Sequence, residues 1–478
     1  MTDTRTDDSR TLQVEVENDS RVAANHLLTG AVFLVLGGAL KLASLMSLRF
    51  ADIFPVTYGR LEPMANLTLM IGFISISLIG GIYYVLPRLT GTRLRAASLA
   101  RSQLIGLAVL VPVGLLAIGL GFGTGGQPFG LPWWINLPMT LLLAVPALVT
   151  IGTISARTEN HSYVTLWFVL GGVIWLPLLY LALFSGDLPY LSSLAVGYTQ
   201  VFFSAGFVTM FLFTVGTGLF YYTMVRELDV SLASRQLAMV GFWSLGFAAV
   251  WWGTAQLMFG PGPSWLSGVG AGIGLAFPIG ALANAVNASL TLDGAWDEVR
   301  DRADLRSGVL GLYLGVGVAV IAALAGFRSI ASVTSLTGFW QAVEYTAISG
   351  VGTLLIASLS FSAVPRLFGR ELYTKRAKPF LTLTLTGSVG VLVFMAAAGL
   401  VSGYSWIGGS NSGAYIDAGE GWGAGLGASV ETLMLIAVGF AVVTFFGQLA
   451  YAATVIGTVT QGKAATQEVL VTKDAGDE

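Results

Sequence analysis

The chain has 478 residues, of which 55% are apolar and 10% charged, and its mean hydropathy is +0.77. Because about a quarter of the residues of an ordinary soluble protein are charged, this composition indicates an integral membrane protein. The net charge of −2 gives no electrostatic reason to expect nucleic acid as a partner. The sequence has no cysteine and two histidines, which excludes disulfides and thiolate metal sites and leaves imidazole for at most two metal ligands.

Twelve apolar runs are each about 20 residues long, the length that crosses a bilayer as a helix. They predict an all-α bundle of twelve transmembrane helices within one membrane domain, residues 25–460. The polar segments at either end, 1–24 and 461–478, are expected to be disordered cytoplasmic tails. The approximate spans are 26–48, 65–86, 101–121, 136–155, 163–184, 194–224, 237–258, 266–290, 307–327, 339–364, 379–402 and 429–456.

The basic residues indicate how the helices are oriented. Of the 24 Lys and Arg residues, 20 precede the first helix, follow an even-numbered helix or follow the twelfth. Only Arg49, Arg60 and Arg328 fall in loops on the opposite side. Since Lys and Arg near helix ends are retained on the cytoplasmic side, both termini are expected to be cytoplasmic.

Ionisable residues inside predicted helices are costly in a membrane and are therefore candidate functional groups. Lys41, Glu344 and Glu431 all fall in the outer half of the bilayer and form a candidate polar pathway. Lys41 could form a buried pair with Glu344, or its stem could extend to the outer interface. His26 and His161 each open a helix at the cytoplasmic interface. No catalytic triad, phosphate loop or dinucleotide fingerprint occurs in the sequence.

Five stretches in collinear order resemble subunit I of the haem-copper oxidases, in the branch of the cbb-type cytochrome c oxidases and nitric oxide reductases. They are YGRLEPMANLTLMIGF (58–73), PRLTG (87–91), FWSLGFAAVWWGTAQLMFGPGPSW (242–265), NASLTLDGAWDEVR (287–300) and PRLFGRELY (365–373). The resemblance implies a twelve-helix bundle with both ends inside a prokaryotic-type plasma membrane. It also implies a place in a respiratory-type complex with other membrane or redox subunits.

The resemblance further implies haem b and copper, held in that family by six histidines. Position by position, these ligands fall on residues other than histidine, namely Ala65, Ala205, Ala255, Gln256, Val343 and Tyr345. Because Ala and Val carry no donor atom for iron or copper, we expect no haem, no copper and no catalytic residue. Tyr345 as a phenolate and Met64 as a thioether are the substitute haem ligands nearby.

These observations leave several functions open. The first is a membrane subunit that resembles cbb-type oxidase subunit I but lacks its catalysis, and acts as a scaffold or as a proton or ion pathway beside redox subunits. A twelve-helix small-molecule permease and an active oxidase or nitric oxide reductase with unusual ligation are the alternatives. Inverted repeats would favour a permease, whereas a threefold arrangement of helices would favour the oxidase scaffold. The emptied haem site is expected to be filled by bulky side chains or to hold a small ligand.

Overall fold

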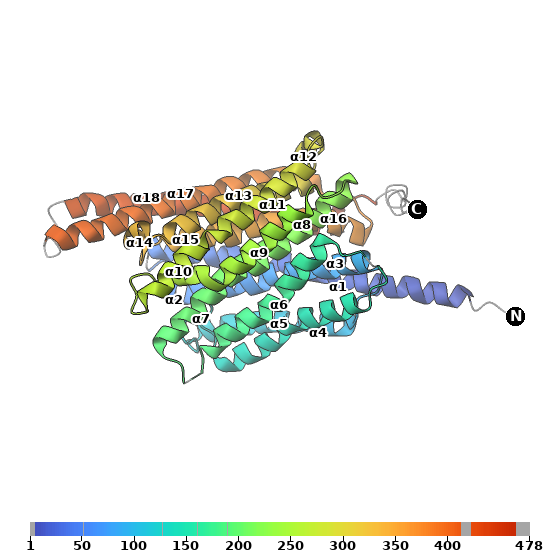
Figure 1. Ribbon diagram of the computed structural model, residues 1–478, viewed down its shortest axis with the longest axis horizontal. Helices are drawn as coiled ribbons and strands as arrows, with labels where there is room; N and C mark the ends of the chain where they lie inside the picture. The colour runs from blue at the N-terminus through green and yellow to red at the C-terminus, as the bar shows by residue number, and fades with distance from the viewer. Residues whose placement is uncertain are drawn as a thin grey trace.

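The computed structural model describes residues 5–50, 52–126, 128–159, 161–188, 190–412 and 422–464, with side chains except in 5–19, 406–412 and 422–428. These residues form a bundle of long helices (Figure 1). The α-helices are α1 (Arg5–Arg49), α2 (Tyr58–Asn66), α3 (Ile76–Thr90), α4 (Ala97–Gly119), α5 (Trp133–Ser155), α6 (Val164–Ser185), α7 (Ser193–Gly206), α8 (Thr214–Leu228), α9 (Arg235–Trp251), α10 (Ser264–Gly274), α11 (Ala276–Thr291), α12 (Trp296–Asp301), α13 (Ala303–Ala325), α14 (Arg328–Thr334), α15 (Phe339–Tyr345), α16 (Thr353–Phe368), α17 (Ala377–Ser412) and α18 (Trp422–Gln461). Five tighter or wider helical segments join them: η1 (Leu67–Ser75), η2 (Phe207–Phe213), η3 (Trp252–Leu257), η4 (Thr346–Gly352) and η5 (Thr374–Arg376).

Twelve stretches of the described residues are long and apolar enough to cross a membrane, which confirms the predicted twelve-helix bundle. Several consist of more than one element: α2, η1 and α3 form the second span, α7, η2 and α8 the sixth, and α15, η4 and α16 the tenth. An even number of crossings brings the start of α1 and the end of α18 to the same end of the bundle (Figure 1).

The first helix is longer than the sequence predicts. α1 begins at Arg5, so its helix extends into the segment 1–24 that we expected to be a disordered tail. Adding turns to an existing helix costs much less than nucleating a new one, which allows the transmembrane helix to continue beyond the apolar run. Residues 1–4 and 465–478 lie outside the described residues, where the prediction of disordered tails stays a prediction.

Three spans form the centre of the bundle. In the second and tenth spans every residue of the most apolar 18-residue stretch is buried, and in the sixth span 83% of that stretch is buried. In the other spans found among the described residues the buried share of this stretch is 39–61%. The outer spans therefore turn one face to the lipid, while the three central spans are covered by protein. Their side chains can be polar without meeting lipid.

The central spans repeat one pattern. Each is an α-helix, a π-helical segment (η1, η2 or η4) and a second α-helix. π-Helical turns are rare and occur mostly at functional sites. Because these are the second, sixth and tenth spans, the pattern returns every four helices. Such a threefold repetition agrees with the oxidase scaffold rather than with the inverted halves of a permease.

The central spans also end alike, on the cytoplasmic side. Each closes on a residue in the left-handed region whose backbone N–H donates to the carbonyl four residues earlier. These residues are Gly91 (φ +65°), Asp229 (φ +52°) and Gly369 (φ +59°), and an arginine stands three positions before each. All three helices therefore end with the same local arrangement, an arginine followed three positions later by a residue in the left-handed region.

Candidate functional site

The outer halves of the three central spans enclose a cavity of about 320 Å³. The span ends that line it face the outer side, opposite the basic loops. Ligand pockets in proteins usually hold about 300–1,000 Å³, so this space is large enough for a small molecule. Its polar lining comes from Tyr58, Glu62, Asn66, Gln200, Ser204, Gln256, Gln341 and Glu344, and two indole rings, Trp252 and Trp340, complete the wall.

A buried ion pair stands beside this cavity. The Lys41 ammonium on α1 pairs with the Glu62 carboxylate on α2 and donates a second hydrogen bond to Asn66 Oδ1 at 3.1 Å. The Ser44 hydroxyl donates to the other Glu62 oxygen at 2.6 Å. The side chains of Lys41 and Glu62 are only 5% and 7% exposed, so this is an ion pair inside the protein. Lys41 therefore pairs with Glu62 and not with Glu344, the partner considered as one of its two possibilities from the sequence.

Glu344 lies in the wall of the same cavity without such a partner. It is close enough to Lys41 and Glu62 for both charges to act on it. Its Oε1 atom is buried and has no hydrogen-bond partner among the described residues. The polar lining thus holds one paired and one unpaired carboxylate.

The third residue of the predicted polar pathway lies elsewhere. Glu431 on α18 pairs with Arg49 at 3.1 Å, and its side chain is 64% exposed. An exposed pair of this kind is a surface contact of the helix ends. The candidate pathway therefore consists of Lys41, Glu62 and Glu344, without Glu431.

Sequence reasoning missed Glu62 because hydropathy alone starts the second span at residue 65, whereas the helix begins at Tyr58. The polar residues of its first two turns were assigned to a loop. The spacing of Glu62 and Asn66, four residues apart, was the available signal, because such residues share one helix face.

The positions that correspond to the family's metal ligands surround this cavity or lie next to residues that line it. Ala65, Ala205, Ala255 and Val343 are all buried, with at most 3% exposure. Val343 and Gln256 line the cavity. Gly253 brings this region close to α7, because a Cβ at that position would lie 2.3 Å from the Val201 carbonyl oxygen.

The two substitute haem ligands do not line the cavity. The Tyr345 hydroxyl is hydrogen-bonded to Thr444 of α18, and Met64 packs against the apolar core. Within the described residues no group of three or more His, Asp or Glu side chains could hold a metal ion. The donors at these positions therefore fit neither haem iron nor copper.

The two histidines lie away from the cavity. His26 is fully buried within the protein: its Nδ1 lies 2.8 Å from the Val22 carbonyl oxygen and its Nε2 lies 3.1 Å from Gln103 Oε1. His161 is exposed and contacts the Tyr163 ring. Each imidazole therefore has a local environment unrelated to the predicted ligand positions.

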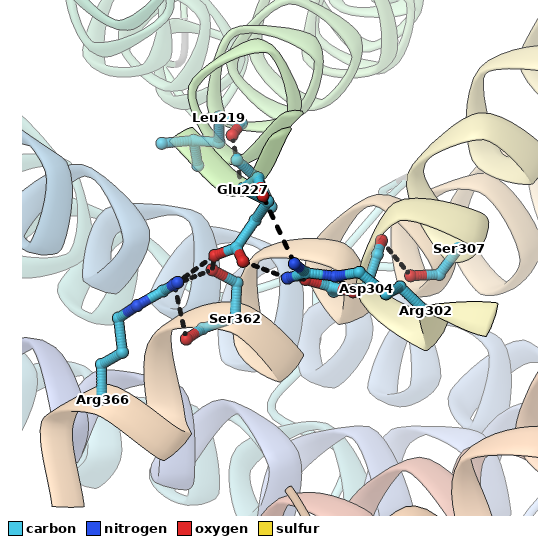
Figure 2. Close-up of polar contacts among 8 residues, drawn as sticks. Leu219, Glu227, Arg302, Asp304, Ser307, Ser362 and Arg366 are labelled. Atoms are coloured by element: carbon cyan, nitrogen blue, oxygen red, sulfur yellow. Dashed lines mark hydrogen bonds and ion pairs between the residues drawn. The ribbon is translucent and has the colours of Figure 1, made fainter. Parts of the chain in front are cut away.

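A second polar cluster ties helix ends together on the cytoplasmic side (Figure 2). The Glu227 carboxylate of α8 is 3% exposed and pairs with Arg302, before α13, and with Arg366 of α16. Ser362 donates to Glu227 at 2.8 Å, and Arg302 also pairs with Asp304 at 2.6 Å. By sequence these arginines fall in the loops after the eighth and tenth predicted spans, and Glu227 lies just beyond the predicted end of the sixth span at residue 224.

Arg302 lies outside the membrane-spanning segments. Burial alone would lower its pKa, but the hydrogen bonds and charges of Asp304 and Glu227 outweigh burial and raise the pKa of the guanidinium. Arg302 is therefore a permanent cation, and the cluster is a structural tie between three helices.

Known proteins are similar to this chain in both sequence and fold. Cytochrome c oxidase subunit 1 of Rhodobacter capsulatus is 24% identical over 370 residues, which cover 73% of this chain and 68% of that protein. A cytochrome c oxidase subunit 1 homolog of Azorhizobium caulinodans is 26% identical, covering 73% of this chain and 66% of its own length. The cbb3-type cytochrome c oxidase subunit CcoN1 of Stutzerimonas stutzeri is 24% identical, with 73% and 76% covered.

A solved structure of a heme-copper terminal oxidase dimer superimposes with a TM-score of 0.76 at 14% identity, covering 93% of this chain and 84% of that one. This similarity shows the shared fold. The family model described as Cytochrome C and Quinol oxidase polypeptide I matches residues 21–424, most of the chain. These matches exclude the alternative of a permease unrelated to oxidases and agree with a multi-pass protein of a bacterial plasma membrane. The chain belongs to the Cytochrome C and Quinol oxidase polypeptide I family.

Proposed function

We propose that this chain is a membrane subunit of a respiratory-type complex that binds neither haem nor copper and leaves redox chemistry to partner subunits. The observation that carries this proposal is the set of buried hydrocarbon side chains at ligand positions: Ala65, Ala205, Ala255 and Val343. Groups around a metal tune it only after direct ligands hold it. The family's scaffold residues therefore cannot replace the missing donors.

An optical spectrum combined with metal analysis tests this proposal. The chain purified alone from haem-replete cells is expected to show no Soret absorbance and no stoichiometric copper. A natively purified complex is expected to show haem only in proportion to its partner subunits. A Soret band of the isolated chain that disappears on Tyr345→Phe or Met64→Leu would contradict the proposal and indicate unusual ligation.

The cavity supports a second role, as the outer part of a proton or ion pathway across the bundle. Lys41, Glu62 and Glu344 place charged groups inside the membrane domain, where such groups usually mark ion or proton pathways. Glu344 is the member that could accept and release a cation, because Glu62 is already paired with Lys41.

A flux measurement in vesicles tests this second role. Wild-type protein is expected to accelerate dissipation of a pH gradient, and Glu344→Gln is expected to abolish that acceleration. Glu431→Gln is the matched control, because it makes the same chemical change at an exposed site outside the cavity. Equal flux with and without the protein would refute conduction without bearing on the absence of haem.

A further inference from the structure

The charges around the outer cavity do not balance. Lys41 contributes one positive charge, and Glu62 and Glu344 contribute one negative charge each when ionised. Lys41 is held by Glu62 and Asn66, so its hydrogen bonds are directed to the α2 side of the site. One negative charge, on Glu344, is left over in the wall.

An unpaired carboxylate inside a protein is costly, so such a group either takes up a proton or is bound to a cation. A divalent metal needs several oxygen ligands. No cluster of three acidic or imidazole side chains occurs in the part of the chain that the structure describes. The chemistry of the wall therefore points to a monovalent cation rather than to a divalent metal ion.

The cavity is also much larger than a bare monovalent ion needs. Its wall includes the rings of Trp252 and Trp340, whose centroids lie 6.1 Å apart. Indole rings attract organic cations through their π-electrons. Both indole N–H groups are buried without an acceptor among the described residues, and the amides of Gln200 and Gln256 lie in the same wall. These groups suit a molecule that carries both a positive charge and hydrogen-bonding atoms.

We propose that the outer cavity is a binding site for a small organic ammonium ion, with its charge held by Glu344 and its body packed against the indole wall formed by Trp252 and Trp340. Tyr58 and Pro128, which come from the outer end of α2 and from the loop between α4 and α5, line the same cavity. The ligand therefore enters from the outer side. This inference rests on the proposed absence of haem from the same space.

Isothermal titration of the purified full-length chain with ethanolammonium chloride tests the site, and neutral ethylene glycol serves as the uncharged analogue. Wild type is expected to bind ethanolammonium saturably and ethylene glycol at least tenfold more weakly. Glu344→Gln, which keeps the size of the side chain, is expected to weaken ethanolammonium binding by at least about tenfold, since it removes a buried charge partner. Glu431→Gln is expected to bind as wild type does.

A Trp340→Leu variant tests the aromatic wall separately and is expected to weaken binding without removing the charge. No saturable heat with wild type, or equal affinity for ethanolammonium and ethylene glycol, would overturn the site. So would undiminished binding by Glu344→Gln. An absorption spectrum of the same sample keeps the two proposals apart: a Soret band refutes the proposed function, whereas loss of binding without a Soret band refutes this inference alone.

Discussion

Lys41 has two carboxylates within reach, and the structure gives it the one on the neighbouring helix. Glu62 and Asn66 stand one turn apart on α2, so a single ammonium can bond to both. Ser44, three residues beyond Lys41 on α1, completes the hydrogen bonds of Glu62. Among the described residues Glu344 has no comparable set of donors around it. Lys41 is therefore a fixed structural cation, and Glu344 is the group available for exchange.

This arrangement predicts a specific pattern of stabilities. Lys41→Met leaves Glu62 buried without its cation and is expected to lower the free energy of unfolding by about 3–5 kcal/mol. For the double variant Lys41→Met with Glu62→Gln, the decrease in the free energy of unfolding is expected to be much smaller than the sum of the decreases for the two single variants. Chemical unfolding in detergent measures all four proteins.

The control for this cycle pairs Lys41→Met with Glu431→Gln, whose effects are expected to add because the two sites share no partner. Additive effects in the Lys41–Glu62 cycle would show that the pair does not interact in the folded protein.

Single elements explain both the success and the limits of sequence-based prediction. Hydropathy located the helices because about 20 apolar residues are needed to cross a bilayer. It began the second span after Glu62 and ended the sixth span before Glu227. Both helices continue through these residues because a helix covered by protein can contain charged residues that are paired. The π-helical segments η1, η2 and η4 had no signal in the apolar pattern. The family's ligand positions came from the resemblance, but the cavity beside them depends on contacts between helices that are distant in sequence.

The helices α3 and α16 end in the same way, on Gly91 and Gly369, but replacing each glycine by alanine is expected to lower the free energy of unfolding by different amounts. At Gly369 no atom of the described residues lies within 4 Å of an added Cβ, so the φ of +59° is the cost that opposes Gly369→Ala. We expect this variant to lower the free energy of unfolding by about 1–2 kcal/mol. At Gly91 the Cβ would also lie 2.5 Å from Thr158 Oγ1, so Gly91→Ala is expected to cost more.

Thermal unfolding in detergent compares these variants with Asp229→Gly, which relieves a non-glycine residue of its left-handed conformation and is expected to be neutral or stabilising. A destabilising effect of Asp229→Gly, or no effect of either alanine variant, would contradict the proposed role of the left-handed termini.

The molecule as a whole has a basic cytoplasmic end and an outer end that holds the cavity. The absence of cysteine allows this orientation to be measured with single introduced thiols. Thr124→Cys lies in the exposed loop between α4 and α5, and Ser231→Cys in the exposed loop between α8 and α9. On intact cells an impermeant maleimide is expected to label the first and not the second.

Both thiols are expected to react after the cells are opened, which shows that each is accessible in the folded protein. Labelling of Ser231→Cys on intact cells would reverse the orientation, and with it the side from which the cavity is entered.

The Glu227 cluster has a consequence for the synthesis of the protein. Its partner Arg366 follows about 140 residues later in the chain. At about 5–20 residues per second, the sixth span waits roughly 10–30 s for that partner after it leaves the ribosome. Lys41 and Glu62, on successive helices, can pair almost at once. The first and second spans can therefore pack against each other in the membrane early in synthesis. Glu227 meets Arg302 after 75 residues, but the centre of the bundle stays incomplete until the tenth span brings Arg366.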